Sequence, residues 1–287
     1  MLRYELRMDV RYSASARDFK RYTTEETRNE FLIEKVFMAD RITAVYSHVD
    51  RIITLGAMPV ERDLVLDEEY CSEADLGQPY FLAGREMGIV NIGGKGRVYV
   101  DGTAYELDRL EGLYVPMGTK DVIFQAGNPE NPPKFYCSTV PAHHRYAVKH
   151  ITSEMARAEA KGDISTSNAR VQRQYVHPSV VESCSLLMGV TSLQEGSVWM
   201  TQPPHLHDRR MEVYMYFDVK DGEFVSHFMG EPKETRHIIC HNEQAVISPS
   251  WSIHSSCGSS NYSIVWAMTG ENKDFDDMDV LAKTDLR

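Results

Sequence analysis

The chain has 287 residues, 42% of them hydrophobic and 25% charged, and its formal net charge is −11 at pH 7. This length suits one large domain or two smaller ones, and the ordinary balance of apolar and charged residues excludes the disordered and fibrous classes. The acidic charge argues against a nucleic acid as partner, since phosphate binding needs a basic surface. We also expect no membrane association, because no apolar run approaches the roughly 18–20 residues that cross a bilayer.

The first element that the pattern predicts is a short helix within TTEETRNEFLIEKVF. Thr23 or Thr24 is suited to cap it, because a threonine hydroxyl accepts a hydrogen bond from the first turn, and acidic residues fill that turn. From Arg41 onward, short runs rich in Val, Ile, Tyr and Phe alternate with Gly, Asp, Asn and Pro, which is typical of a β-sandwich or barrel. Asp101-Gly102 predicts a tight hairpin turn.

A polar stretch at 150–174, HITSEMARAEAKGDISTSNARVQRQ, interrupts this β pattern. We interpret it as the link between two halves and predict a short helix within SEMARAEAKG. After it the β pattern returns, for example in SVWMTQPPHLH, MEVYMYFDV and YSIVWAMTG. The predicted domains are therefore 1–155 and 156–287.

The two halves resemble each other over short stretches. REMGIV in the first half aligns with RRMEVY in the second, and LYVP aligns more loosely with VISP. Asp121 and His254 stand five residues past the two aligned prolines, and Gly88 takes the place of Glu212 in this alignment. Self-similarity at this scale indicates a duplicated β domain.

The segment PPHLHDRRME carries the clearest chemical pattern. His205 and His207 are two residues apart, so in a strand their side chains point to one face and are placed to share an ion. Glu212 has the opposite parity, so a turn around 208–210 must bring it round. His254 follows a strand and a turn marked by proline. Three imidazoles and a carboxylate suit Zn²⁺, Fe²⁺, Mn²⁺ or Ni²⁺, with positions left for a ligand.

HxH(x)4E followed by PxxxxH resembles the two sequence motifs of the cupin superfamily. The resemblance implies an all-β fold with a few short helices, a duplicated cupin in which each half is a double-stranded β-helix or jelly-roll barrel. The N-terminal half lacks the HxH motif and resembles a cupin without metal. Trp251 and Gly258 stand where the family usually has glycine and asparagine, which leaves the ligands intact but predicts an altered pocket wall.

Longer motifs resemble the family of 5-keto-4-deoxyuronate isomerases, bicupin enzymes of pectin and uronate breakdown. They are scattered from residue 28 to the C-terminus and comprise RNEFLIEKVF, VYSHVDRII, NIGGKG, RRMEVYMYF, ETRHI, HNEQAVISPSWSIHS and FDDMD. The resemblance implies conversion of 4-deoxy-L-threo-5-hexosulose uronate to 3-deoxy-D-glycero-2,5-hexodiulosonate. It also implies one Zn²⁺ per subunit, held by His205, His207, Glu212 and His254, and a homohexamer.

Such an isomerisation moves a proton between neighbouring carbons while an oxyanion develops. Glu212 is a candidate base if it loosens from the metal, although a purely structural ligand role is the alternative. The uronate carboxylate favours a bidentate arginine, for which Arg170, Arg210 and Arg236 are candidates. Gln244, on a strand expected to line the barrel, is a further candidate substrate contact.

Three other functions stay open from the sequence. An iron-dependent cupin dioxygenase would consume oxygen, another sugar isomerase would need a basic phosphate cradle, and a non-catalytic sugar-binding or regulatory cupin would turn over nothing. The five cysteines are odd in number and form no CxxC pair, which indicates reduced thiols in the cytoplasm.

Overall fold

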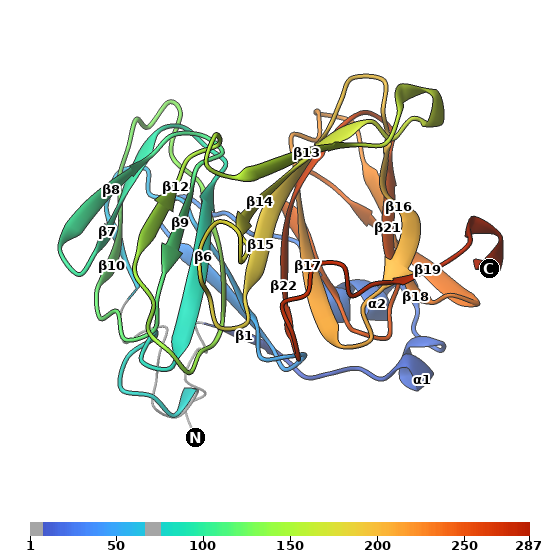
Figure 1. The fold of residues 1–287 in the computed structure, drawn as a ribbon, viewed down its shortest axis with the longest axis horizontal. Coiled ribbons are helices and arrows are strands. Elements are labelled where there is room, and N and C mark those ends of the chain that lie inside the picture. Colours follow the sequence, from blue (N-terminus) through green and yellow to red (C-terminus); the bar gives the residue numbers. More distant parts are fainter. Residues whose placement is uncertain (1–7, 67–75) are drawn as a thin grey trace. The chain divides into compact units, whose positions relative to one another are not determined.

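The computed structural model describes residues 8–66 and 76–287, and over these residues the fold is almost entirely β (Figure 1). The chain forms two compact units. Unit 1 comprises the described residues of 1–11, 35–156 and 175–186, and unit 2 comprises 12–34, 157–174 and 187–287. The chain passes from unit 1 to unit 2 after Ala156, one residue beyond the boundary predicted at 155/156, and two further segments depart from a simple division into halves. Residues 12–34 belong to unit 2 and 175–186 to unit 1, and local sequence patterns carry no information on such long-range packing.

Unit 1 is built from a seven-stranded and a four-stranded sheet. In spatial order the larger sheet contains β1 (Asp9–Arg11), β3 (Ile42–Ser47), β4 (Ile53–Ala57), β11 (Phe135–Pro141), β6 (Arg85–Asn91), β9 (Gly112–Val115) and β12 (Lys149–Ile151). The smaller sheet contains β5 (Leu64–Val65), β10 (Val122–Gln125), β7 (Gly96–Val100) and β8 (Thr103–Leu107). The predicted turn at Asp101-Gly102 joins β7 to β8, and both residues have positive φ.

Unit 2 repeats this plan with one more strand in its smaller sheet. Its larger sheet contains β13 (Arg157–Lys161), β14 (Arg170–Val176), β15 (Leu187–Leu193), β22 (Ser263–Gly270), β17 (Arg210–Phe217), β20 (Gln244–Ser248) and β2 (Leu32–Ile33). The smaller sheet contains β19 (Glu234–Cys240), β18 (Val225–Glu231), β21 (His254–Gly258), β16 (Trp199–Leu206) and β23 (Asp279–Val280). The first six strands follow the same order in the two larger sheets, while the seventh is β12 in unit 1 and the N-terminal β2 in unit 2. This shared order confirms the duplicated all-β architecture.

The helices of the described chain are short and pack on unit 2. They are α1 (Ala16–Phe19), α2 (Thr24–Phe31) and the 3₁₀ turns η1 (Ile164–Thr166) and η2 (Lys283–Asp285). The predicted helix is confirmed as α2, where Thr23 and Glu26 form a reciprocal capping box. Trp251 packs its ring against Phe19 and Phe31. This tryptophan packs against the helices and is not among the cavity-lining residues. The prediction that it alters the pocket wall is therefore wrong.

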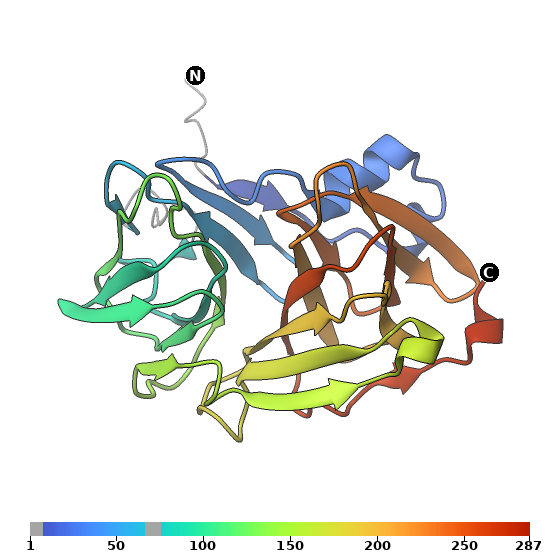
Figure 2. The same ribbon diagram turned by 90° about the horizontal axis from the view of Figure 1, so that it is seen from above.

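The helix predicted within SEMARAEAKG is wrong, because the second half of this segment forms strand β13. Residues of β13 pair antiparallel with β14 from Arg157↔Gln174 to Lys161↔Arg170 (Figure 2). Ala and Glu favour helices when packing does not decide the conformation, but a hydrogen-bonded neighbour strand outweighs that preference. The segment is therefore a hairpin that extends the larger sheet of unit 2 rather than a free link.

Strands β6 and β17 occupy the same place in their sheets, which corrects the sequence alignment of the two halves. Each lies between an antiparallel neighbour on either side, β11 and β9 for β6, and β22 and β20 for β17. Met87 pairs with Val115 and Glu212 pairs with Ser248, and a proline follows each partner. Met87, not Gly88, is therefore the equivalent of Glu212. The sequence alignment was displaced by one residue because it matched the two methionines.

The interiors of the two barrels differ in polarity. The cluster in unit 1 is formed by apolar side chains and includes Met87, Ile89 and Phe124. The cluster in unit 2 carries hydroxyl-bearing aromatics, among them Tyr214 and Tyr216, beside aliphatic residues. Of the described cysteines, Cys137, Cys184, Cys240 and Cys257 are free thiols, whereas Cys71 lies outside the described residues. No helix of the described chain is long and apolar enough to cross a membrane.

Candidate metal centre

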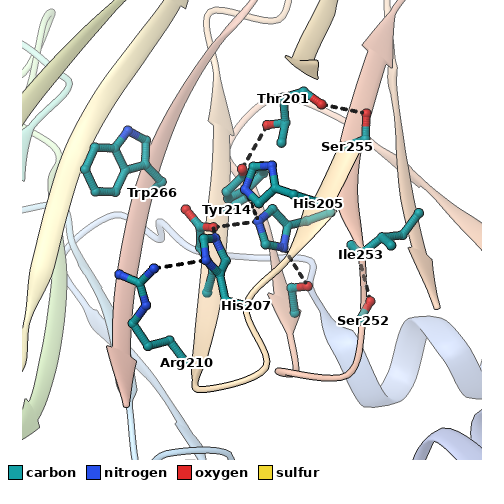
Figure 3. Close-up of polar contacts among 12 residues, drawn as sticks. Thr201, His205, His207, Arg210, Tyr214, Ser252, Ile253, Ser255 and Trp266 are labelled. Atoms are coloured by element: carbon teal, nitrogen blue, oxygen red, sulfur yellow. Dashed lines mark hydrogen bonds and ion pairs between the residues drawn. The ribbon is translucent and has the colours of Figure 1, made fainter. Parts of the chain in front are cut away.

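Four predicted ligands meet in unit 2 at one end of its barrel. His205 lies near the end of β16, His207 follows it, Glu212 lies in β17 and His254 begins β21. One potential ligand atom from each residue lies within 4.8 Å of all the others. His254 Nε2 is 2.9 Å from Glu212 Oε2 and 3.1 Å from His205 Nε2, and His207 Nε2 is 3.4 Å from the same glutamate oxygen. Figure 3 shows the rings of His205 and His207 close to each other beside Tyr214.

The backbone explains how residues so far apart in sequence come together. His205 and His254 are direct partners in the ladder between β16 and β21. The chain then turns at His207, whose carbonyl accepts a hydrogen bond from the Arg210 N–H at 3.0 Å. This turn resets the parity, so that Glu212 points to the barrel interior with Tyr214. The predicted turn around 208–210 is thereby confirmed.

Each Nδ1 has an oxygen within 3.5 Å that can accept its proton, and His207 Nδ1 also has the donor Arg210 Nη2 at 3.1 Å. Nδ1 of His207 lies 3.1 Å from the Asp277 carbonyl, and Nδ1 of His205 lies 3.3 Å from the Pro203 carbonyl. Nδ1 of His254 is 3.5 Å from the Ser248 hydroxyl. A proton held on Nδ1 leaves the Nε2 lone pair free, and in all three rings Nε2 faces the shared centre.

The spacing of the ligand atoms fits a transition-metal ion. Ligands about 2.1 Å from one ion stand roughly 3.0 Å apart in octahedral geometry and roughly 3.4 Å apart in tetrahedral geometry. The three short separations, from 2.9 to 3.4 Å, fall in this range. Side chains of His207, Glu212 and His254 are almost fully buried. Three imidazoles and one carboxylate that converge in a buried position form a ligand set that divalent transition metals bind.

The surroundings of the cluster shift the pKa values of His205, His254 and Glu212. Burial lowers the pKa of His205 to about 3, with the neighbouring imidazoles adding to the effect. Burial also lowers the pKa of His254. For Glu212, burial alone would raise the pKa, but His254 and His207 outweigh it and hold the pKa far below the usual range. Neutral imidazoles beside an ionised carboxylate are the ligand forms that divalent metals bind.

A cavity of about 280 Å³ opens onto the cluster. His205, His207 and Glu212 line it together with the hydroxyl-bearing side chains of Thr201 and Tyr214. The Tyr214 hydroxyl and Thr201 Oγ1 lie 2.9 Å apart, and burial raises the pKa of Tyr214 well above its usual value, so this phenol stays protonated. The wall is completed by hairpin β13–β14, which contributes Lys161, Arg170 and Gln172, and by apolar residues. A small polar molecule bound here meets the ligand cluster directly.

The predicted substrate contacts divide into one that lines the cavity and three that do not. Arg170 lines it, with its guanidinium donating to the carbonyls of Asn168 at 2.9 Å and Gln202 at 3.3 Å. Arg210 is buried behind His207 and is not a lining residue. Gln244 and Arg236 also lie outside the lining.

These three side chains have other partners. Gln244 accepts a hydrogen bond from the His241 N–H at 2.9 Å. Arg236 donates to the carbonyl of Thr235 and pairs with Glu234, both at 3.1 Å. Arg210 donates to the carbonyl of Asp277 at 2.7 Å. The contacts hold these residues as parts of the framework, and the substrate role predicted for them gains no support from their positions.

Sequence reasoning missed Lys161, Gln172 and Asp277. Lys161 was hidden by the expected helix and Gln172 by the link expected at 150–174, since only the pairing of β13 with β14 turns alternate residues of the hairpin toward the cavity. Asp277 lies in the motif FDDMD, which carried family resemblance but no chemical pattern of its own. Its role depends on a backbone carbonyl, and sequence says nothing about where a carbonyl points.

Comparison with known proteins agrees with the resemblance that the sequence motifs indicated. The family model described as "KduI/IolB family" matches residues 46–282. The chain is 52% identical over 280 residues to the 4-deoxy-L-threo-5-hexosulose-uronate ketol-isomerase of Lachnoclostridium phytofermentans, covering 98% of this chain and 100% of that protein. It is 50% identical, with the same coverage, to the protein of that name from Escherichia coli strain SMS-3-5.

Among solved structures, the fold is similar to that of an IolB-like protein from Salmonella typhimurium LT2. The TM-score is 0.67 at 14% identity, and the match covers 88% of this chain and 96% of that one. At this identity the likeness concerns the fold alone, which is the duplicated cupin barrel expected from the motifs.

Proposed function

The chain belongs to the KduI/IolB family, and from that premise we propose that it is a metal-dependent 4-deoxy-L-threo-5-hexosulose-uronate ketol-isomerase. The observation that carries this function is a single cavity that is lined both by His205, His207 and Glu212 of the ligand cluster and by the cationic Arg170 and Lys161. The substrate is an aldehyde at one end and a carboxylate at the other. The cavity offers a complementary group to each end.

The reaction converts an aldehyde with a neighbouring hydroxyl into a hydroxymethyl group with a neighbouring ketone. One proton leaves the hydroxyl-bearing carbon and one joins the former aldehyde carbon, while a second proton passes between the two oxygens. A divalent ion held by His205, His207, Glu212 and His254 would supply a positive charge for the oxygen atoms as negative charge develops on them. The chain's own groups must then bind the rest of the substrate and move the protons.

Hairpin β13–β14 is suited to the carboxylate end. Arg170 and Lys161 are ladder partners, and both line the cavity. Lys161 Nζ is 3.3 Å from Glu159, which leaves its charge partly offset. Arg170 makes two hydrogen bonds to backbone carbonyls but has no carboxylate partner among the ion pairs of the described residues. A guanidinium without an anionic partner on a cavity wall favours an anionic ligand.

Tyr214 and Gln172 are suited to the hydroxyl groups of the sugar chain. The Tyr214 hydroxyl is protonated and lies beside the cluster, so it is placed to donate to a substrate oxygen. Gln172 Oε1 is buried and has no hydrogen-bond partner within the described chain. A substrate hydroxyl would satisfy this acceptor, and an unsatisfied buried acceptor costs about 1–3 kcal/mol.

Glu212 carries the proposed proton transfer only if it leaves the ligand cluster. Its pKa lies below the usual range, so it is ionised and is a weak base where it stands. Movement away from His254 would raise its basicity. This role remains a proposal next to that of a permanent ligand, and substitution alone does not separate the two.

The metal we propose is Zn²⁺, one per subunit, since three imidazoles and one carboxylate without a thiolate suit it, as they suit Mn²⁺, Fe²⁺ or Ni²⁺. We further propose a cytoplasmic homohexamer that acts in pectin and uronate breakdown. The free thiols of the described chain support a reducing compartment. The hexamer and the pathway rest on the family resemblance alone, and light scattering of the purified protein tests the first.

The relatives' names favour an isomerase over the iron-dependent dioxygenase and over the non-catalytic sugar-binding cupin. Both are distinguished by the same assay. Purified protein is given the 5-keto sugar acid anaerobically in D₂O, and product is followed by NMR before chelation, after chelation and after return of a single metal. We expect conversion to the 2,5-diketo acid that chelation stops and Zn²⁺ restores.

Deuterium on the former aldehyde carbon would support proton exchange with a base. No conversion by fully metal-loaded protein would reject the function, and uptake of oxygen would favour the dioxygenase. Conversion that survives complete metal removal would reject metal dependence while leaving the isomerase activity intact.

A further inference from the structure

The segment 272–280 contacts the metal centre from outside the ligand set. Within it, Phe275, Met278 and Val280 line the cavity, whereas Asp277 points the other way and makes polar contacts. None of the four ligands belongs to this segment. Its contacts with the ligand histidines are nevertheless direct.

Two of the three ligand histidines depend on this segment for their position. The Asp277 carbonyl lies 3.1 Å from His207 Nδ1 and can accept its proton, and Arg210 Nη2, which donates to that carbonyl at 2.7 Å, lies 3.1 Å from the same Nδ1. The residues of β23 pair antiparallel with β16, with His205 opposite Val280. The backbone on which His205 stands is therefore hydrogen-bonded to the same segment whose carbonyl holds His207.

The Asp277 side chain fixes the place of its own carbonyl. Its carboxylate accepts from Arg209 Nε at 2.9 and 2.7 Å, and Arg209 Nη2 forms a further short contact with it. Asn272 Nδ2 donates to the same carboxylate at 2.6 Å. Arg210 Nη2 donates to the carbonyl itself at 2.7 Å. A planar guanidinium bound side-on to a carboxylate sets direction as well as distance, so the clamp limits where the carbonyl can point.

We infer that Asp277 is a positioning residue for His207, and that its clamp to Arg209 sets how tightly the centre holds its metal. This inference rests on the metal site of the proposed function. Partners of ligand imidazoles typically change metal affinity by 10–100-fold when they are lost. Here the partner is the backbone carbonyl of Asp277, which substitution cannot remove. The experiment therefore removes the Asp277 side chain or Arg209, which hold that carbonyl in place.

The coupling must act in both directions. If an ordered segment strengthens metal binding, a bound metal must order the segment by the same free energy. Hydrogen exchange at 272–280 should therefore be faster in metal-free than in Zn²⁺-loaded protein. The wall of the cavity formed by Phe275 and Met278 would loosen together with the metal, which links substrate binding to metal occupancy.

The test measures Zn²⁺ affinity by competition with a chelator, in the full chain and without any activity assay. We expect Asp277→Ala and Arg209→Ala each to weaken Zn²⁺ binding by about tenfold or more. Because both substitutions break one clamp, the double variant should be no weaker than Asp277→Ala alone. Asp277→Asn, which keeps an acceptor for Arg209, should fall between. Asp276→Ala is the matched control, since it removes the same charge from the neighbouring exposed residue.

Different results identify different failures. Unchanged Zn²⁺ affinity in both clamp variants would overturn this inference and leave the metal-dependent isomerase standing. Equal weakening by Asp276→Ala would show a general effect of charge and overturn it as well. A fall in thermal stability of the metal-free protein without a change in Zn²⁺ affinity would reduce Asp277 to a structural residue. A wild-type protein that binds no metal would reject the inference together with metal dependence.

Discussion

Strands β6 and β17 open with the same three residue types in a different order. Unit 1 has Arg85-Glu86-Met87, and unit 2 has Arg210-Met211-Glu212. Because side chains alternate along a strand, the exchange of two neighbours sends the carboxylate to opposite faces. In unit 1 the methionine fills the barrel, and in unit 2 the glutamate does.

The two buried carboxylates consequently have different chemistry. Glu86 is fully buried and saturated with donors, accepting from the backbone N–H groups of Cys184, Ser185 and Leu186 at 2.7–2.9 Å. The Tyr114 hydroxyl adds a fourth hydrogen bond at 2.7 Å. Glu212 faces imidazoles instead. The equivalent strands β6 and β17 thus carry a structural carboxylate in unit 1 and a candidate ligand carboxylate in unit 2. The side of the sheet to which the carboxylate points makes the difference.

The largest expected effect comes from Glu212→Gln. Loss of the anionic ligand should lower kcat/KM by on the order of 10³-fold, because a bound metal contributes several kcal/mol to such a reaction. Metal content by elemental analysis and turnover of the 5-keto sugar acid measure it. Met211→Leu, one residue away on the other face, serves as control and should stay within a few-fold. Equal loss in both variants would mean that the strand, and not the ligand, is at fault.

Arg170→Met removes a cation at the start of β14 in unit 2. The corresponding strand of unit 1 is β3, which begins with the core residue Ile42 instead. We expect kcat/KM to fall roughly 10–100-fold, since a hydrogen bond to a charged group is worth roughly 1.5–3 kcal/mol. Arg170→Lys should lose less, because it keeps the charge but not the fork. Steady-state kinetics measure the effect, with Arg236→Met as control. An unchanged KM in Arg170→Met would show that another residue binds the substrate carboxylate.

Glu86→Gln addresses the structural carboxylate. An amide presents one acceptor oxygen where the carboxylate presents two, so buried N–H groups lose their partner and unfolding should become easier by about 1–3 kcal/mol. Urea unfolding measures the free energy, and Zn²⁺ affinity should not change. Glu106→Gln removes an exposed carboxylate paired with Arg97 and should cost little. A loss of metal in Glu86→Gln would show that the two units are not independent in this respect.

The last prediction concerns acid, where the effect is small for each unit of pH. Burial lowers the pKa of His227 from 6.5 to about 3, so below pH 6.5 the unfolded chain takes up a proton that the folded barrel does not. Metal-free protein should therefore lose stability as pH falls from 6.5 toward 3. In His227→Gln the slope should be shallower by at most about 1.4 kcal/mol per pH unit. Denaturant titrations at several pH values measure the slope, and identical slopes would exclude a contribution from His227.

Three of the four candidate metal ligands were predictable from a local pattern, whereas His254 was placed by its resemblance to the second cupin motif. The spacing of His205 and His207 follows from strand parity, and the turn before Glu212 follows from its opposite parity. Thr23 and Glu26 likewise lie within one helical turn of each other, so the cap could be predicted. What these residues share is that their partners are close in sequence.

The remaining features required knowledge of pairing between distant segments. The alignment of Gly88 with Glu212 was wrong by one residue, because only the ladder to β9 and β20 fixes the register. The helix expected at 153–162 gave way to a strand because β14 lies beside it. Lys161 and Asp277 act through positions that depend on tertiary structure, and no spacing rule locates them.

The crossing of residues 12–34 into unit 2 has a consequence for synthesis on the ribosome. Leu32 pairs with Val246, and Phe31 belongs to the same buried cluster. At a usual rate of about 5–20 residues per second, these side chains wait roughly 10–40 s for their partner strand to be made. Throughout that time these apolar side chains lack their partner strand on the nascent chain. The residues of unit 1 are all synthesised before that strand. Translation speed and chaperone supply should therefore govern the yield of this protein more strongly than its final stability does.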